Sequence, residues 1–171
     1  NIISEYNNKG YRDAEITKDT TYLNNDNTLT IEMTIDEGEP YLFGNITFIG
    51  NTKFTNEDLI RQLGIEKGEV FNQSILDSRL FGSQEGTDIS SLYLDDGYLF
   101  FNATPVEVST NNNSIDLEIR LYEGEQARIN KISVNGNTKT QDHVIMRELR
   151  TRPGDLFKRS DILRSQRELA Q

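Results

Sequence analysis

The four residues "GNTK" at Gly50–Lys53 occur again at Gly136–Lys139, and this duplication is the strongest indication of how the chain is built. The copies are 136 − 50 = 86 residues apart, about the length of one small domain. At this offset, "EGEPYLFGNITFIGNTKFTNEDLIRQLGIEKGEVF" from Glu37 and "EGEQARINKISVNGNTKTQDHVIMRELRTRPGDLF" from Glu123 share 12 identical residues in 35. Chance would give about two identities. The chain therefore consists of tandem repeats.

Weaker matches continue on the N-terminal side of this block. "KGYRDAEI" from Lys9 resembles "DGYLFFNATPVEV" from Asp96, and "TLTIEMTIDEGE" from Thr28 aligns with "SIDLEIRLYEGE" from Ser114. We expect the chain to be part of a longer protein, because it starts and stops inside repeats. The predicted division is as follows: 1–38, the C-terminal part of a first repeat; 39–124, a complete repeat with an insertion near 82–88; 125–171, the N-terminal part of a third repeat.

The sequence of the complete repeat predicts the order strand, helix, helix, strand, strand. A strand is expected over Leu42–Asn51, and Thr55 with Asp58 forms a capping-box pattern for a helix that Gly64 ends. Asn72 is the expected cap of the second helix. The residues predicted to face the core are Leu42, Ile46, Phe48, Leu59, Ile60, Leu63, Phe71, Ile75, Leu76 and Leu80. The loop Gly82–Asp88 is the expected insertion, after which a helix can resume and close at Gly97.

Two predicted strands then form a hairpin with one apolar face. The first, Leu99–Ser109, contains Pro105, which lacks an amide donor and therefore favours a sheet edge. The second alternates apolar and polar residues. An earlier hairpin repeats the pattern, with residues 24–27 as its turn, and the EGE of each repeat is followed by an apolar strand. The two predicted inner faces are Leu29, Ile31, Met33 and Ile35, and Ile115, Leu117, Ile119 and Leu121.

Composition excludes several classes of function. The net charge of −10 disfavours nucleic acid or an anionic membrane surface as the main partner. No apolar run is long enough to cross a bilayer, and the chain has no cysteine. His143 is the only histidine, so the usual hydrolytic triads and zinc sites are not available. We expect no enzyme, no cofactor and no metal.

The order of elements and motifs resembles POTRA domains, the polypeptide-transport-associated repeats of BamA-type outer-membrane β-barrel assembly factors. The motifs are the EGE link, the GN turn, the GD/GE-x-F opening of the second helix, and the GY pairs Gly10-Tyr11 and Gly97-Tyr98. The resemblance implies an α+β fold of tandem β-α-α-β-β units, each a small three-stranded sheet covered on one face by two helices. It also implies a place on the periplasmic side of the bacterial outer membrane, with unfolded outer-membrane proteins and accessory assembly lipoproteins as partners and a downstream barrel as the only membrane contact.

The predicted binding site is the edge of the strand that contains Pro105. An exposed edge lets an extended client pair through backbone groups alone, so that many sequences can bind. The alternative is that this strand is only the outer strand of a small sheet. One of Phe100 and Phe101 is expected to contact a client, a neighbouring repeat or the insertion loop. The predicted site residues are Phe100, Phe101, Asn102, Ala103, Thr104, Val106, Glu107 and Val108.

The EGE links are expected to set the angle between repeats, and they can act either as hinges or as plain solvated links. Their residues are Glu37, Gly38, Glu39, Glu123, Gly124 and Glu125. Two other functions remain open for the same fold. One is the periplasmic array of a two-partner secretion transporter, and the other is a structural scaffold that binds no client strand. A calcium-dependent module is a remote third, because the Asn- and Asp-rich turns lack the spacing of an EF-hand loop.

Overall fold

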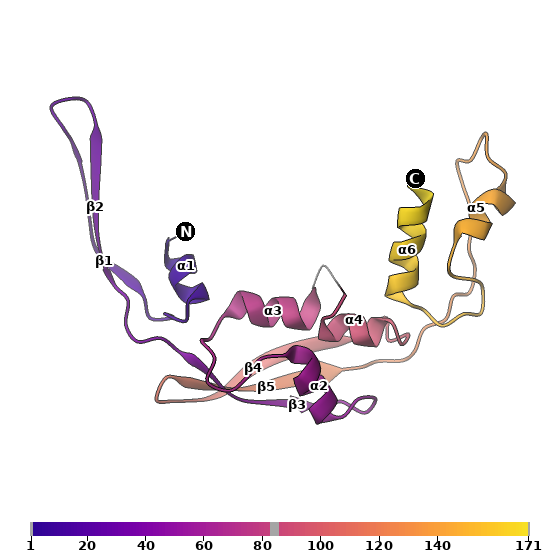
Figure 1. Ribbon diagram of the computed structural model, residues 1–171, viewed down its shortest axis with the longest axis horizontal. Helices are drawn as coiled ribbons and strands as arrows, with labels where there is room; N and C mark the ends of the chain where they lie inside the picture. The colour runs from indigo at the N-terminus through magenta and orange to yellow at the C-terminus, as the bar shows by residue number, and fades with distance from the viewer. Residues whose placement is uncertain (1, 83–85, 171) are drawn as a thin grey trace. The chain divides into compact units, whose positions relative to one another are not determined.

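The computed structural model describes residues 2–82 and 86–170 and is a mixed α+β chain (Figure 1). Residues 83–85, the middle of the predicted insertion, lie outside the described residues. The elements follow in the order α1 (Ile2–Asn8), β1 (Glu15–Leu23), β2 (Leu29–Asp36), β3 (Leu42–Ile49), α2 (Asn56–Leu63), α3 (Gln73–Phe81), α4 (Ile89–Leu94), β4 (Asn102–Asn111), β5 (Ser114–Tyr122), α5 (Asp142–Glu148) and α6 (Arg159–Leu169).

The chain divides into two compact units. The first comprises Asn1–Ile46, Ile65–Leu76 and Val106–Glu118, and the second comprises Thr47–Gly64, Asp77–Pro105 and Ile119–Gln171. This division runs through strands β3, β4 and β5, whereas the predicted repeat boundaries lie between elements. The three-repeat division of the chain stays a prediction.

The first compact unit contains the hairpin β1–β2. Its strands pair antiparallel from Glu15 opposite Asp36 to Leu23 opposite Leu29. The predicted turn at 24–27 is confirmed, because Asn27 has φ 62°, a conformation that asparagine tolerates better than most residues.

The expected burial of the β2 apolar face was wrong. Leu29 and Ile31 are 59% exposed and Met33 is 44% exposed, while Ile35 is half-buried. The alternation itself is correct, but β1 and β2 form a sheet of only two strands among the described residues, and their apolar face is uncovered.

A three-stranded sheet has the order β3-β5-β4. The central strand β5 follows the predicted alternation throughout: its four apolar residues are at most 8% exposed. The turn before it also matches the prediction, since Asn112 and Asn113 both have positive φ. The complete repeat therefore has the core and the strand order expected of a β-α-α-β-β unit, with α4 as an additional helix.

Both predicted helix caps of the complete repeat are present. The Thr55 side chain accepts a hydrogen bond from the Asp58 N–H and Gly64 closes α2 with φ 62°, while the Asn72 side chain accepts from the Ile75 N–H at the start of α3. Two predicted core positions were wrong, because Ile60 is 41% exposed and Ile75 is 48% exposed. In each helix the residue pair spaced i, i+4 fills the core-facing side instead. Those pairs are Leu59 with Leu63, and Leu76 with Leu80.

The two GNTK copies fold into the same turn. The Asn51 amide donates to the Phe54 carbonyl at 2.9 Å, and the Asn137 amide donates to the Thr140 carbonyl at 2.8 Å. The asparagine of the motif thus closes the turn that precedes each following helix. The sequence duplication corresponds to a structural duplication.

The C-terminal part departs from the prediction in its first element. The segment after Glu125 is not a strand and contains only an isolated bridge, between Arg128 and Leu156. Its counterpart β3 pairs with β5, whereas no described strand lies beside this segment. A strand needs a paired neighbour for its backbone groups, which explains why the expected strand was wrong.

Candidate functional site

The sheet has two edges, and the β4 edge is the more open one. The start of strand β3 is paired with the segment 68–71. The Phe43 N–H donates to the Glu69 carbonyl and the Gly68 N–H donates to the Phe43 carbonyl, both at 2.8 Å. Strand β4 lies at the opposite end of the strand order. Within residues 2–82 and 86–170, no backbone hydrogen bond from outside the sheet reaches β4.

Strand β4 starts and ends later in the chain than the predicted strand Leu99–Ser109. Strand β4 begins at Asn102, so that Phe100 and Phe101 precede it. Phe101 stacks on the buried Tyr93 ring with centroids 4.1 Å apart, and Phe100 is 67% exposed. Of the two adjacent aromatic residues, Phe101 is therefore half-buried against the core and Phe100 lies on the surface. The remaining predicted site residues lie in β4: Asn102, Ala103, Thr104, Val106, Glu107 and Val108.

One charged residue against β4 was missed by the sequence analysis. The Arg12 guanidinium pairs with the Glu107 carboxylate at 2.9 Å and lies over the Phe71 ring at 5.1 Å. Both groups of the ion pair are partly exposed, which limits its contribution to stability. Arg12 directly follows the Gly10-Tyr11 motif, but nothing in its local sequence indicates a partner 95 residues away (107 − 12 = 95).

The first glutamate of the second EGE link is a structural anchor. Glu123 is 8% exposed and accepts hydrogen bonds from the Thr52 N–H at 2.8 Å, the Lys53 N–H at 3.1 Å and the Tyr93 hydroxyl at 2.9 Å. The Thr52 hydroxyl also donates to it. The EGE link and the GNTK turn thus form one connected group, which we call the Glu123 clasp.

The hydrogen bonds of the Glu123 clasp hold the carboxylate in its charged form. Burial by itself would raise the pKa of Glu123. The donors from Thr52, Lys53 and Tyr93 together outweigh burial, so the pKa lies below its usual value. The same environment raises the pKa of the Tyr93 hydroxyl, through desolvation first and the Glu123 hydrogen bond second.

The other EGE residues lie on the surface. Glu37, Glu39 and Glu125 are exposed, and Gly38 and Gly124 have φ of 66° and 69°. Glu37 accepts a hydrogen bond from the Tyr6 hydroxyl at 2.8 Å. A hinge at either link stays a prediction.

The two GY motifs make the same backbone contacts. The Gly10 carbonyl accepts from the Tyr41 N–H and the Gly97 carbonyl accepts from the Ala127 N–H, each at 2.8 Å. Both glycines have φ near 90°, and a Cβ on Gly97 would lie 2.6 Å from Leu156. Each motif therefore requires glycine for a close approach as well as for its backbone conformation.

Other kinds of site find no support in the described part of the chain. Residues 2–82 and 86–170 contain no group of three or more His, Cys, Asp or Glu side chains that could hold a metal ion. No helix in these ranges combines the length and the apolar character that a bilayer span requires. His143 is exposed on α5.

Comparison with solved structures identifies the fold. The structure superposes on the crystal structure of Haemophilus influenzae BamA POTRA3-5 with a TM-score of 0.68 and 20% sequence identity, over 98% of this chain and 65% of that chain. This likeness shows the fold.

Several named relatives align with nearly the whole chain. A Treponema pallidum protein, described as a candidate outer membrane protein assembly factor, is 29% identical over 98% of this chain. The outer membrane protein assembly factor BamA of Neorickettsia risticii is 27% identical over 96%, and that of Neisseria meningitidis is 27% identical over 92%. The chain spans only 20% to 21% of the length of these relatives.

The family model of POTRA, the surface antigen variable number repeat, matches residues 41–124 and 127–171. Together these ranges cover more than half of the chain. The chain belongs to the POTRA family.

Proposed function

We propose that this chain is the periplasmic client-binding and scaffolding region of an outer-membrane protein assembly factor. In this proposal, an extended segment of an unfolded barrel protein adds as a strand along β4. The strand order β3-β5-β4 carries the proposal, because it leaves β4 at an edge. Edge N–H and C=O groups can pair with any extended chain, whatever its side chains.

The side chains of β4 support this function. Val108 is 53% exposed and Val106 is half-buried, so apolar residues of a client can gain contact beside the backbone bonds. The exposed Phe100 precedes the strand and extends the apolar surface. The names of the relatives favour an outer membrane protein assembly factor. Accessory assembly lipoproteins are the further partners that we propose. In this proposal the chain binds and positions the client, and no covalent bond is made or broken.

A titration of the isotopically labelled chain with an extended barrel-derived peptide tests the proposal. We expect the amide resonances of Asn102–Val108 to shift, and a peptide of the same composition in scrambled order to shift them as well. A third peptide, with methylated backbone nitrogens, is the matched control and is expected to leave them unchanged. Equal binding of the methylated peptide, or shifts confined to other residues, contradicts strand addition.

The same titration separates the alternative functions. A transporter array dedicated to one client is expected to bind its own peptide and to reject the scrambled one. A purely structural array is expected to bind neither. The assembly function requires both peptides to bind, because an assembly factor serves many sequences.

A further inference from the structure

Three exposed apolar residues lie at one end of the three-stranded sheet. Ile49 is the last residue of β3, Tyr122 is the last residue of β5, and Phe100 lies just before β4. Their exposed fractions are 49%, 66% and 67%. Ile49 and Tyr122 directly follow the buried Phe48 and Leu121, so their side chains lie on the face of the sheet away from the core. We call these three residues the strand-end patch.

The residues of the strand-end patch are neighbours in space. A Cβ on Gly124 would lie 3.4 Å from the Phe100 Cβ and 3.5 Å from the Tyr122 Cε1, so the two aromatic residues flank this glycine. Gly50, the residue after Ile49, lies against the backbone of β5. The patch therefore extends across the end of the sheet to the start of β4.

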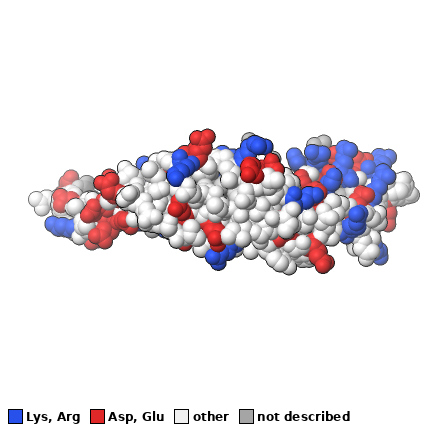
Figure 2. All heavy atoms as spheres, turned by 90° about the horizontal axis from the view of Figure 1, so that it is seen from below, with Lys and Arg blue, Asp and Glu red and all other residues white. Residues whose placement is uncertain are grey.

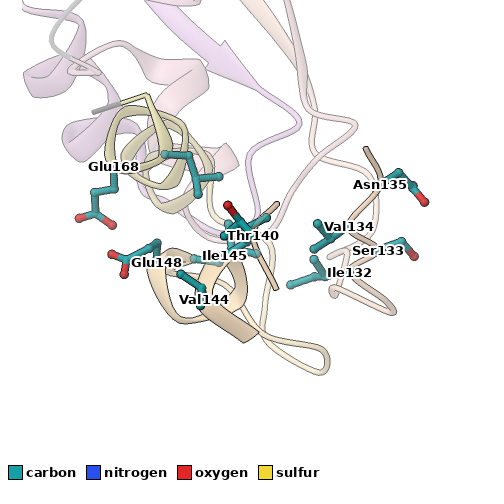
Figure 3. A pocket seen from close by; sticks show the side chains of 11 residues that line it. Ile132, Ser133, Val134, Asn135, Thr140, Val144, Ile145, Glu148 and Glu168 are labelled. Carbon is teal, nitrogen blue, oxygen red and sulfur yellow. The ribbon is translucent and has the colours of Figure 1, made fainter. Parts of the chain in front are cut away.

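The fold does not require apolar residues at these positions. A Cβ on Gly38 would lie 3.4 Å from the Asp13 Cβ, which makes Asp13 the structural counterpart of Phe100. The counterparts of Tyr122 and Ile49 follow from the offset of 86 residues, and Figure 3 shows the counterpart of Ile49 pointing away from α5. The counterparts of Phe100, Tyr122 and Ile49 are Asp13, Asp36 and Asn135, and all three are polar and exposed. The apolar character of the patch is thus particular to the complete repeat.

A repeat that follows does not cover these positions. Asp13 accepts a hydrogen bond from the Tyr41 hydroxyl of the complete repeat at 2.8 Å and is nevertheless exposed, and Asp36 is exposed as well. Leu99 does not belong to the patch, because its counterpart Arg12 pairs with a side chain of the complete repeat. The exposure of the strand-end patch is therefore a property of the complete repeat and does not arise from the ends of the chain.

The strand-end patch adjoins the proposed client site. Phe100 precedes the first residue of β4, Asn102, by two residues, which is about 7 Å of extended chain. A client strand that pairs along β4 therefore reaches the patch with the next one or two residues of its own chain. The patch and the β4 edge form one continuous surface.

Charge does not mark the strand-end patch. Figure 2 shows acidic side chains gathered at the β1–β2 end and basic ones gathered at the α5–α6 end. Close to the patch in the chain, Lys53 pairs with Asp96 at 2.7 Å, and Glu123 accepts the hydrogen bonds of the clasp. Because these charged groups already have partners, an apolar group is the occupant that suits the exposed side chains of the patch.

We propose that the strand-end patch binds a large apolar side chain of the client, at a residue just beyond the segment that pairs with β4. This inference rests on the proposed strand addition at β4. Backbone pairing accepts many sequences, whereas contact with the patch adds affinity for segments that carry a large apolar residue at this position. The site is therefore broad in the sequences that it accepts and graded in how tightly it binds them.

Two versions of the extended barrel-derived peptide test the inference, one with tryptophan at both ends and one with serine at both ends. Substitution at both ends places one tryptophan at the patch whichever direction the client strand takes. We expect the tryptophan peptide to bind about tenfold more tightly, because an indole ring leaves water at the patch. Its fluorescence is expected to shift to shorter wavelength, and the signal belongs to the peptide because the chain contains no tryptophan.

A double variant, Phe100→Ser with Tyr122→Ser, locates the preference. We expect it to reduce the ratio of the two affinities from about ten to about one. Ile75→Ser removes an apolar side chain that is 48% exposed on α3 and is the matched control, which is expected to keep the tenfold ratio. A preference that survives in the double variant, or that is lost in the control, overturns the inference. Far-ultraviolet circular dichroism checks that both variants are folded.

The same titrations distinguish failure of this inference from failure of strand addition. If both peptides shift the Asn102–Val108 amide resonances with equal affinity, strand addition stands and the role of the patch is overturned. If neither peptide shifts them, strand addition fails and the inference that rests on it fails too. A fluorescence shift without amide shifts in β4 also overturns the inference, because the patch then binds apolar groups without a paired strand.

Discussion

The hairpins β1–β2 and β4–β5 have the same apolar pattern and opposite environments. The apolar residues of β5 are at most 8% exposed, whereas three of the four in β2 are at least 44% exposed. Both hairpins use asparagine at positive φ in their turns: Asn27 between β1 and β2, and Asn112 with Asn113 between β4 and β5. The difference arises from what lies against each face. A local pattern specifies which side of a hairpin is apolar, and tertiary contacts determine whether that side contributes to stability.

The largest expected difference between the hairpins is in core truncation. Leu117→Ala in β5 is expected to lower the free energy of unfolding by about 2–5 kcal/mol, because it leaves a cavity at a position 2% exposed. Ile31→Ala in β2 is expected to cost less than about 1 kcal/mol, because the side chain is already 59% exposed. Urea unfolding of both variants measures the difference. Similar losses of unfolding free energy at Leu117 and Ile31 would contradict the exposure of the apolar face of β2.

A smaller difference is expected between the two equivalent glutamates. Glu123→Gln disturbs the buried clasp and is expected to cost about 2–3 kcal/mol, while Glu37→Gln changes an exposed group and is expected to cost about 0.5 kcal/mol or less. Chemical denaturation at neutral pH measures both effects. Equal losses of unfolding free energy contradict the exposed position of Glu37.

The pH dependence of the Glu123 effect follows from its lowered pKa. The folded chain binds this proton more weakly than the unfolded chain, so the stabilisation is complete above the ordinary glutamate pKa and is lost as the pH falls through the lower folded value. The stability gap between the unmodified chain and Glu123→Gln is therefore expected to narrow below about pH 4. A gap that widens on acidification contradicts this assignment.

The smallest effect is expected in the turns, where the two hairpins should agree. Asn113 and Asn27 have φ of 59° and 62°, and alanine at either position adopts this conformation at a cost of about 1 kcal/mol. Amide hydrogen exchange of the neighbouring strand residues compares Asn113→Ala with Asn27→Ala. We expect a similar local loss of protection in both, because turn conformation depends on the residue itself and little on the cover of the hairpin. A loss confined to one hairpin shows that its turn is also held by tertiary contacts.

The particular successes and failures of the sequence-based predictions have one physical basis. The caps at Thr55 and Asn72 and the turns before β2 and β5 were predicted correctly, because each depends on neighbours within a few residues. The expected strand after Glu125 was wrong, since a strand needs a partner that the local pattern cannot supply. For the candidate site, the edge strand was anticipated from Pro105, but the start of β4 at Asn102 was not.

The sequence by itself determined the tandem repeat, the order of elements in the complete repeat, the apolar side of each hairpin and the positions of the tight turns. These features depend on residue types at fixed local spacing. The same types occur twice in the chain, 86 residues apart. Only the tertiary structure decided that Phe101 packs on Tyr93 while Phe100 is exposed, that Arg12 pairs with Glu107, and that the glutamate of an EGE link closes the GNTK turn. Each of these depends on groups far apart in the chain, whose meeting is set by the packing of whole elements against one another.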